Sequence, residues 1–214
     1  MSPDSSELGA RFTLWFMGLP SSGKSTVAKI VENQLRRKGF TIENLDGDNL
    51  RSHLHPDLGF TKEERGINNR RIAYITQLLN KNEVGSIVAA ISPFQEYRQL
   101  VREIVEEEGR FFLIYVECPL EICKERDPKG LYEEAEKGNI PNFTGVSHPF
   151  EAPDDGEYDL KIDTSQLDPD KAAGKVITML EEEGILTAVD RDTGLTDEEE
   201  EQIKDRLRRL GYLG

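Results

Sequence analysis

Residues 18–26 read Gly18-Leu19-Pro20-Ser21-Ser22-Gly23-Lys24-Ser25-Thr26. They follow the apolar run 12–17 and precede a stretch in which apolar residues recur at helical spacing. A glycine-bounded turn between a strand and a helix aims backbone N–H groups at phosphate oxygens. In such a loop the lysine reaches the β- and γ-phosphates, and the hydroxyl that follows it can ligate Mg²⁺. The run therefore predicts a phosphate-binding loop that uses Lys24 and Ser25 in these roles.

The composition limits the classes of partner. The 214 residues contain 27 Lys and Arg against 41 Asp and Glu, a net charge of −14. This balance argues against a broad electrostatic hold on nucleic acid or anionic lipid, so a phosphate must be held locally. The longest apolar stretch, 111–116, is far shorter than the ~20 residues of a membrane span, and residues 1–4 do not resemble a signal peptide. We expect a cytoplasmic protein with no membrane partner.

The two cysteines, Cys118 and Cys123, are spaced neither as a redox pair nor as a zinc site. Free cysteines are often buried, and we interpret these two as thiols packed beside a buried strand.

Short apolar runs alternate with helical patterns along most of the chain. Strands are predicted at 11–17, 41–46, 84–91, 111–117 and 160–163, and helices at 24–38, 61–82, 95–108, 119–126 and 171–183. This alternation indicates a parallel sheet. Residues 61–64 fit a capping box, Pro119 suits a first helical position, and Asp168 followed by Pro169 suits another helix start. We predict an α/β protein of the P-loop NTPase type, a three-layer sandwich around a five-stranded parallel sheet.

Three segments do not follow this alternation of strands and helices. Residues 127–156 are rich in turn signals, with one short helical stretch at 131–137. A long loop region inside a compact domain is usually functional, and we interpret it as a lid. Residues 1–10 form an N-terminal tail before the P-loop domain at 11–186, and 187–214 form a C-terminal extension. In the extension a capping box at 196–199 and apolar residues at helical spacing predict one amphipathic helix over about 196–210.

A pair of acids follows the strand 41–45, in the sequence Asp46-Gly47-Asp48-Asn49. These carboxylates lie at the carboxyl edge of the predicted sheet, where open α/β sheets bind ligands. One acid can face magnesium while the other faces an acceptor hydroxyl. A GTPase would carry a guanine-reading Asn-Lys-x-Asp after a strand, and the nearest string, 80–83, is a poor match at a predicted helix end.

Further motifs occur in order along the chain. They are Leu45-Asp-Gly-Asp-Asn-Leu-Arg51, Asp57-Leu-Gly-Phe60, Arg65, Asn68, Arg70-Arg-Ile-Ala73, Ile91-Ser-Pro-Phe94, Arg126-Asp-Pro-Lys-Gly-Leu-Tyr132, Phe143-Thr-Gly145 and Glu151-Ala-Pro153. With these motifs the chain resembles the adenylylsulfate (APS) kinase family from about residue 11 to 165. The resemblance implies transfer of the ATP γ-phosphate to the 3′-hydroxyl of adenosine 5′-phosphosulfate, giving 3′-phosphoadenosine 5′-phosphosulfate and ADP in sulfate assimilation or activation. It also implies Mg²⁺ as cofactor and, because the family is commonly dimeric, a homodimer.

Site residues follow from this resemblance position by position. On the donor side, ATP contacts come from Gly18, Leu19, Pro20, Ser21, Ser22, Gly23, Lys24, Ser25 and Thr26, with Ser25 and Asp46 at the metal. The catalytic set is Lys24, Asp46, Asp48, Ser92 and Lys129. We choose Asp48 to accept or orient the 3′-hydroxyl proton and Asp46 to order the magnesium shell, although the two could exchange these roles. Lys129, on the lid, could supply positive charge at transfer.

On the acceptor side the matching positions are Asp48, Asn49, Arg51, Phe60, Arg65, Asn68, Ile91, Ser92, Lys129 and Phe143. Arg51, Arg65 and Asn68 match positions that grip the phosphosulfate, for which arginine forks are suited. Phe60 and Phe143 match the pair that sandwiches the substrate adenine. Ser92 matches a serine proposed in the family as a phosphorylated intermediate. A nucleophilic serine needs an adjacent base, however, and no His lies near it in sequence, so we expect Ile91 and Ser92 to line the pocket.

One departure from the family pattern lies in the phosphate loop. The family usually carries another glycine there, whereas this chain has Pro20 and Ser21. Ser21 would be strained if the backbone needs a positive φ. Two other readings stay open from the sequence. One is another small-molecule P-loop kinase, such as a nucleoside or sugar kinase, and the other is a non-catalytic nucleotide-binding subunit.

Overall fold

The computed structural model describes residues 11–54 and 56–186. Five strands form one sheet in the order β2-β3-β1-β4-β5, and every neighbouring pair is parallel. The strands are β1 (Phe12–Met17), β2 (Ile42–Asp46), β3 (Gly85–Ala89), β4 (Arg110–Glu117) and β5 (Leu160–Asp163). The predicted parallel five-stranded sheet is therefore confirmed.

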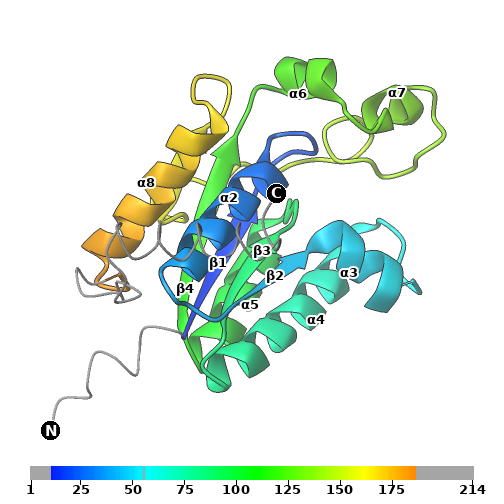
Figure 1. The fold of residues 1–214 in the computed structure, drawn as a ribbon. Helices are drawn as coiled ribbons and strands as arrows, with labels where there is room; N and C mark the ends of the chain where they lie inside the picture. Colours follow the sequence, from blue (N-terminus) through cyan, green and yellow to red (C-terminus); the bar gives the residue numbers. More distant parts are fainter. Residues whose placement is uncertain (1–10, 55, 187–214) are drawn as a thin grey trace, which may run out of the picture.

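Helices cover both faces of the sheet, which gives three layers (Figure 1). They are α2 (Lys24–Arg37), α3 (Gly47–Leu54), α4 (Lys62–Lys81), α5 (Gln95–Glu106), α6 (Leu120–Arg126), α7 (Leu131–Glu136) and α8 (Pro169–Glu182). Phe12, Leu14 and Phe16 of β1 pack in one core cluster with residues of α2 and α8. Trp15 and Met17 pack in a second cluster with residues of α4 and α5. This alternation along β1 follows from the period of two of a strand, because successive side chains point to opposite faces.

Capping residues set several helix boundaries as predicted. The Thr61 side chain accepts from the Glu64 backbone, and the Glu64 side chain accepts from the Thr61 backbone, so the capping box is present. Asp168 caps α8 by accepting from the Lys171 backbone, with Pro169 at the first position. Pro119 stands one residue earlier than expected, at the N-cap of α6 instead of its first helical position.

Helix α3 is absent from the sequence prediction, which places no element between the strand 41–46 and the helix 61–82. In the structure the Asp46 carboxylate accepts a hydrogen bond from the Asn49 backbone N–H at 3.2 Å. This is the bond that an N-cap residue makes to the third residue of a helix. The chain therefore passes from β2 directly into α3, and the acids and glycine that suggest a turn form a helix start.

The segment 127–156 carries α7 and a third, smaller core cluster. Cys118, Cys123, Tyr132, Ala135 and Phe143 make up the buried part of this cluster. Both cysteines are free thiols, as expected. Figure 1 shows α6 and α7 at the end of the sheet at which the chain enters α2 and α3. Residues 1–10 and 187–214 lie outside the described residues, so the tail and the C-terminal helix stay predictions. Within the described part of the chain, no helix is both long and apolar enough to cross a bilayer.

Candidate active site

The candidate site lies at the carboxyl ends of the central strands. The phosphate loop follows β1, which pairs with β3 on one side and β4 on the other. Asp46 ends β2, and the segment 90–94 follows β3. Because parallel strands end at one edge of a sheet, these segments come together although they are far apart in the sequence.

Two glycines in the phosphate loop are required by its geometry. Gly18 has a φ of 148°, and a Cβ there would lie 2.3 Å from the Val116 carbonyl oxygen. Gly23 has a φ of 94° and stands at the N-cap of α2. Ser21 has a φ of 61°, which confirms that this serine occupies a left-handed conformation that L residues avoid. The loop therefore keeps its backbone shape where the family glycine is replaced, at the cost of local strain.

Side chains from distant segments brace this loop. Thr164, just after β5, donates its hydroxyl to the Ser22 carbonyl at 2.7 Å. Tyr132 of α7 donates its hydroxyl to the Pro20 carbonyl at 3.0 Å. Lys24 is buried, and its ammonium group contacts the Leu19 carbonyl and the Ser22 hydroxyl. The sequence prediction assigns no role to Thr164 and names Tyr132 only within a motif, because no local pattern marks residues that brace a loop far from them in the chain.

Ser25 and Asp46 meet beside the loop. The Ser25 hydroxyl donates to Asp46 Oδ2 at 3.1 Å, while Asp46 Oδ1 accepts from the Asn49 backbone. A hydroxyl and a carboxylate that converge are the hard oxygen ligands that Mg²⁺ prefers, and Mg²⁺ in kinases usually takes one or two such protein ligands plus phosphates. Among the described residues there is no cluster of three or more His, Cys, Asp or Glu that could hold a metal by itself. The donor set thus fits a Mg²⁺ that arrives with a nucleotide.

Phe60 and two arginines that are predicted to bind the acceptor form one cluster. The Phe60 ring is 39% exposed, with the Arg51 guanidinium 4.6 Å and the Arg65 guanidinium 5.4 Å from its centroid. Arg65 Nε donates to the Phe60 carbonyl at 3.1 Å, and Arg65 Nη2 donates to the Asn142 carbonyl at 2.9 Å. Since Asn142 precedes Phe143, Arg65 joins the two chain segments that carry the predicted aromatic pair.

Arg65 is a buried cation, only 7% exposed. Burial, together with the positive charge of Arg51, lowers its pKa to about 10. Its hydrogen bonds to protein go to carbonyl oxygens, and none of the ion pairs found within the described chain includes it. A buried guanidinium group with a second guanidinium beside it favours an anion as ligand.

Phe143 and Asn68 are more buried than Phe60. The Phe143 ring is 7% exposed and packs edge-on against Tyr132, with centroids 5.1 Å apart. Asn68 lies one helical turn after Arg65 in α4 and is 6% exposed. Tyr132 therefore contacts both Phe143 and the phosphate loop, so one side chain connects the loop to a ring that is predicted to bind the acceptor.

Ser92 is buried, and its hydroxyl is held by two donors. Trp15 Nε1 donates to Ser92 Oγ at 2.8 Å, and Asn69 Nδ2 donates to it at 3.3 Å. Its φ is 44°, so Ser92, like Ser21, has a left-handed backbone conformation. The neighbouring Ile91 is half-buried, and its carbonyl accepts from the Gly18 backbone at 3.3 Å.

The remaining candidates lie at the periphery of these groups. Lys129 is exposed, in the turn between α6 and α7. Within that turn the Asp127 carboxylate accepts from the backbones of Leu131 and Tyr132. Asn49 lies in the first turn of α3 and is exposed, and Asp48 precedes it in the same turn.

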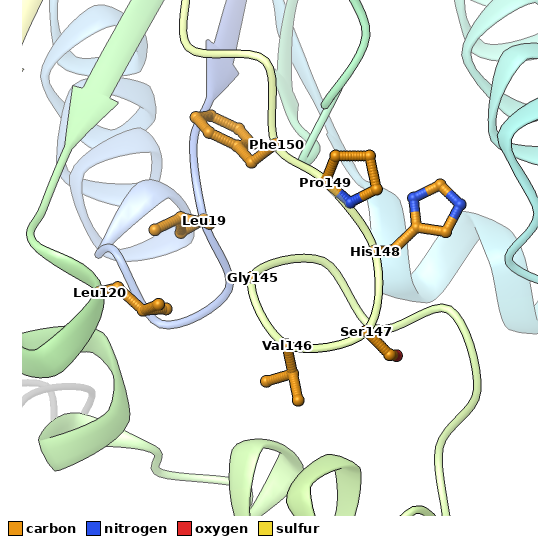
Figure 2. Close-up of a pocket in the computed structure, with 8 residues that line it drawn as sticks. All are labelled: Leu19, Leu120, Gly145, Val146, Ser147, His148, Pro149 and Phe150. Carbon is orange, nitrogen blue, oxygen red and sulfur yellow. The ribbon is translucent and has the colours of Figure 1, made fainter.

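A pocket of about 560 Å³ opens between the phosphate loop and the segment 145–150. Its lining residues are Leu19, Leu120, Gly145, Val146, Ser147, His148, Pro149 and Phe150. Figure 2 shows Leu19 and Leu120 on one side and the curved segment 145–150 on the other, with the His148 ring turned away from the leucines. Of the predicted site residues only Leu19 lines it.

The parallel sheet, the phosphate loop on its central strand and the Asp46 carboxylate that accepts from the Ser25 hydroxyl define the class of P-loop nucleotide-binding proteins. A family model described as adenylylsulphate kinase matches residues 10–162. The adenylyl-sulfate kinase of Halothermothrix orenii is 46% identical over 174 residues, covering 81% of this chain and 91% of that one. The chain belongs to the adenylylsulfate kinase family, and its activity is that of an ATP-dependent kinase.

Solved structures agree with this assignment. The structure of Mycobacterium tuberculosis APS kinase CysC in complex with AMPPNP and APS is 42% identical, with a TM-score of 0.76, covering 79% of this chain and 96% of that one. The hexameric APS kinase from Thiobacillus denitrificans is 32% identical, with a TM-score of 0.63 over 82% of this chain and 30% of that chain. Family membership decides against a different small-molecule kinase and against a non-catalytic subunit.

Proposed function

We propose that the chain transfers the γ-phosphate of ATP to the 3′-hydroxyl of adenosine 5′-phosphosulfate, giving 3′-phosphoadenosine 5′-phosphosulfate and ADP. One observation carries this proposal. The Tyr132 hydroxyl donates a hydrogen bond to Pro20 in the phosphate loop, and its ring packs on Phe143. Arg65 hydrogen-bonds both Phe60 and Asn142, the residue before Phe143. A phosphate-binding half and an aromatic, arginine-lined half are thus linked through two side chains, as a kinase for a second, anionic nucleotide requires.

On the donor side, Lys24 and the backbone N–H groups of the non-proline residues in 18–26 bind the ATP phosphates. Ser25 and Asp46 would hold a Mg²⁺, which would neutralise charge on the transferring phosphate. The chain's own contribution is positioning, since in-line transfer needs little covalent chemistry from the protein. We assign Asp48, in the first turn of α3, to accept or orient the 3′-hydroxyl proton. Lys129 lies in the turn before α7, from which it could bring positive charge to the phosphates.

On the acceptor side, Arg51, Arg65 and Asn68 bind the phosphosulfate, and Phe60 and Phe143 hold the adenine. Two guanidinium groups beside an exposed ring suit a ligand that combines an anion with a purine. Asn49 and Ile91 complete the pocket. These roles rest on the family resemblance and on the cluster around Arg65.

For Ser92 we propose a pocket-shaping role without a phosphoserine intermediate. Its oxygen already accepts hydrogen bonds from Trp15 and Asn69 and is shielded from solvent. Neither partner is a general base for the hydroxyl proton, and a nucleophilic serine needs one.

We further propose that the protein is a cytoplasmic homodimer that acts in sulfate assimilation. Use of ATP and the two free thiols, Cys118 and Cys123, support a reducing, ATP-containing compartment. The oligomer is proposed from the family alone, and sedimentation of the purified chain at several concentrations would test it.

The decisive experiment measures ADP release with ATP, Mg²⁺ and a panel of acceptors. We expect release that depends on adenosine 5′-phosphosulfate and that does not occur with AMP, adenosine, a sugar or a nucleoside. Release with one of the other acceptors, and none with adenosine 5′-phosphosulfate, would refute the proposal.

A further inference from the structure

The segment 91–93, between β3 and α5, is held by hydrogen bonds to three consecutive carbonyl oxygens. The Ile91 carbonyl accepts from the Gly18 backbone at 3.3 Å. The Ser92 carbonyl accepts from Arg98 Nη1 at 3.2 Å, and the Pro93 carbonyl accepts from the Glu151 backbone at 2.9 Å. The segment therefore joins the phosphate loop to helix α5 and to Glu151 near the C-terminal end of the proposed lid.

Arg98 is the buried centre of this arrangement, with 3% of its surface exposed. Besides the Ser92 carbonyl, Nη1 donates to the Glu151 carbonyl at 3.0 Å, and Nη2 pairs with Glu157 at 3.5 Å. Burying a guanidinium group is costly unless it is paired and hydrogen-bonded. Nη1 thus donates to two carbonyl groups from distant segments while Nη2 pairs with Glu157. A lysine has a single nitrogen and cannot reproduce this planar arrangement of two.

Glu151 completes the connection from the other side. Its Oε2 accepts from the Gln95 backbone at 2.8 Å, at the first position of α5. The N-cap residue of that helix, Phe94, makes no side-chain cap bond, so Glu151 replaces a local cap with one from a distant segment. Glu151 is thus hydrogen-bonded to Gln95 at the start of α5, to Pro93 and to Arg98.

Ser92 needs such support because its φ of 44° lies in the left-handed region. Trp15 and Asn69 hold its side chain, and Arg98 holds its carbonyl. The phosphate loop is braced separately, by Thr164 and Tyr132. A change at Arg98 should therefore disturb the acceptor side more than the donor side.

We infer that Arg98 and Glu151 are positioning residues for the acceptor. They fix the backbone of 91–93, and they connect it to residues 151–157 at the C-terminal end of the proposed lid. This inference rests on the proposed function, in which Ile91 and Ser92 line the acceptor pocket.

The test compares Arg98→Lys, Glu151→Ala and Glu151→Gln with a matched control, Arg102→Ala. Arg102 lies one turn further along α5 and ties it to Asp159 at 2.8 Å, without contact to 91–93. Loss of a buried, charge-assisted hydrogen bond should raise the KM for adenosine 5′-phosphosulfate about tenfold in Arg98→Lys. Glu151→Ala should raise it less, and Glu151→Gln should restore it because an amide oxygen can still accept from Gln95. The KM for ATP should stay within about twofold throughout.

The only tryptophan, Trp15, supplies a second readout because it bonds Ser92 directly. Its fluorescence emission should shift in Arg98→Lys and Glu151→Ala, and it should match wild type in Arg102→Ala. An unchanged acceptor KM and unchanged emission in both Arg98→Lys and Glu151→Ala would overturn the inference. Equal increases in the KM for ATP and for the acceptor, if Arg102→Ala reproduces them, would also overturn it. A wild-type chain without acceptor-dependent turnover would instead overturn the proposed function, so the two failures are distinguishable.

Discussion

Replacement of Gly18 by alanine should destabilise the protein far more than the same change at Gly23. Both glycines lie in the phosphate loop, and both have a positive φ, 148° and 94°. They differ in the space around the missing Cβ. At Gly18 that atom would lie 2.3 Å from the Val116 carbonyl oxygen, whereas at Gly23 its nearest neighbour is the Thr164 methyl at 3.7 Å.

The expected magnitudes follow from three contributions. A left-handed alanine costs about 1–2 kcal/mol, and a less flexible unfolded chain returns about 0.4–1 kcal/mol. For Gly23→Ala this leaves a loss of about 1 kcal/mol. Gly18→Ala adds a clash with backbone of a central strand, which cannot rotate away, and overpacking of this kind costs about 1–3 kcal/mol more. We therefore expect a total loss of about 2–4 kcal/mol for Gly18→Ala.

Urea unfolding at constant m-value measures both variants against wild type. The melting temperatures should differ between the two variants by about 4–8 °C for a gap of ~2 kcal/mol in a chain of this size. Ser21→Gly serves as a reverse control, because glycine removes the strain at a φ of 61°. Equal stability of the two alanine variants would refute the reasoning, since it would mean that the contact with β4 has no cost.

Asp48→Ala should abolish turnover while leaving ATP binding nearly intact, because a proton acceptor acts mainly in the transition state; calorimetric titration with ATP and a turnover assay check this, and normal turnover would reject the role. Phe60→Ala should weaken acceptor binding by about 1–3 kcal/mol with little change in stability, since its ring is partly exposed, and an unchanged acceptor affinity would rule out stacking. Tyr132→Phe should leave the Pro20 carbonyl unpaired and cost about 1–3 kcal/mol of stability in thermal unfolding, together with a higher KM for ATP; wild-type values for both would contradict the bracing role. Burial raises the pKa of Glu32, but hydrogen bonds from Asn44, Lys29 and Arg36 outweigh this and lower it, so its stabilisation holds above the unfolded pKa and is lost as the pH falls through the folded value. Stability measured against pH should therefore fall less steeply in acid for Glu32→Gln than for wild type.

Much of the fold and of the site could be predicted because its signals are local in the sequence. The phosphate loop, the alternation of strands and helices, and the caps at Thr61 and Asp168 each depend on residues within one or two turns of chain. The order of motifs from residue 45 to 153 identified the family in the same way. Helix α3 was not predicted because its N-cap, Asp46, is followed by glycine and a second acid, and those residue types also form turns.

Other features depend on contacts between segments far apart in the chain, and only the tertiary structure decided them. No local pattern in the sequence reports that Thr164 and Tyr132 brace the phosphate loop, or that Arg65 joins Phe60 to Asn142. The same holds for Arg98. Its neighbours in the sequence of α5 do not distinguish it from other helical arginines, and only the fold places Ser92 and Glu151 against it. Residue types and short spacings therefore determined which reaction this protein performs. The packing of distant segments decided how its backbone is held, because a hydrogen bond to a carbonyl oxygen requires no particular residue at the accepting position.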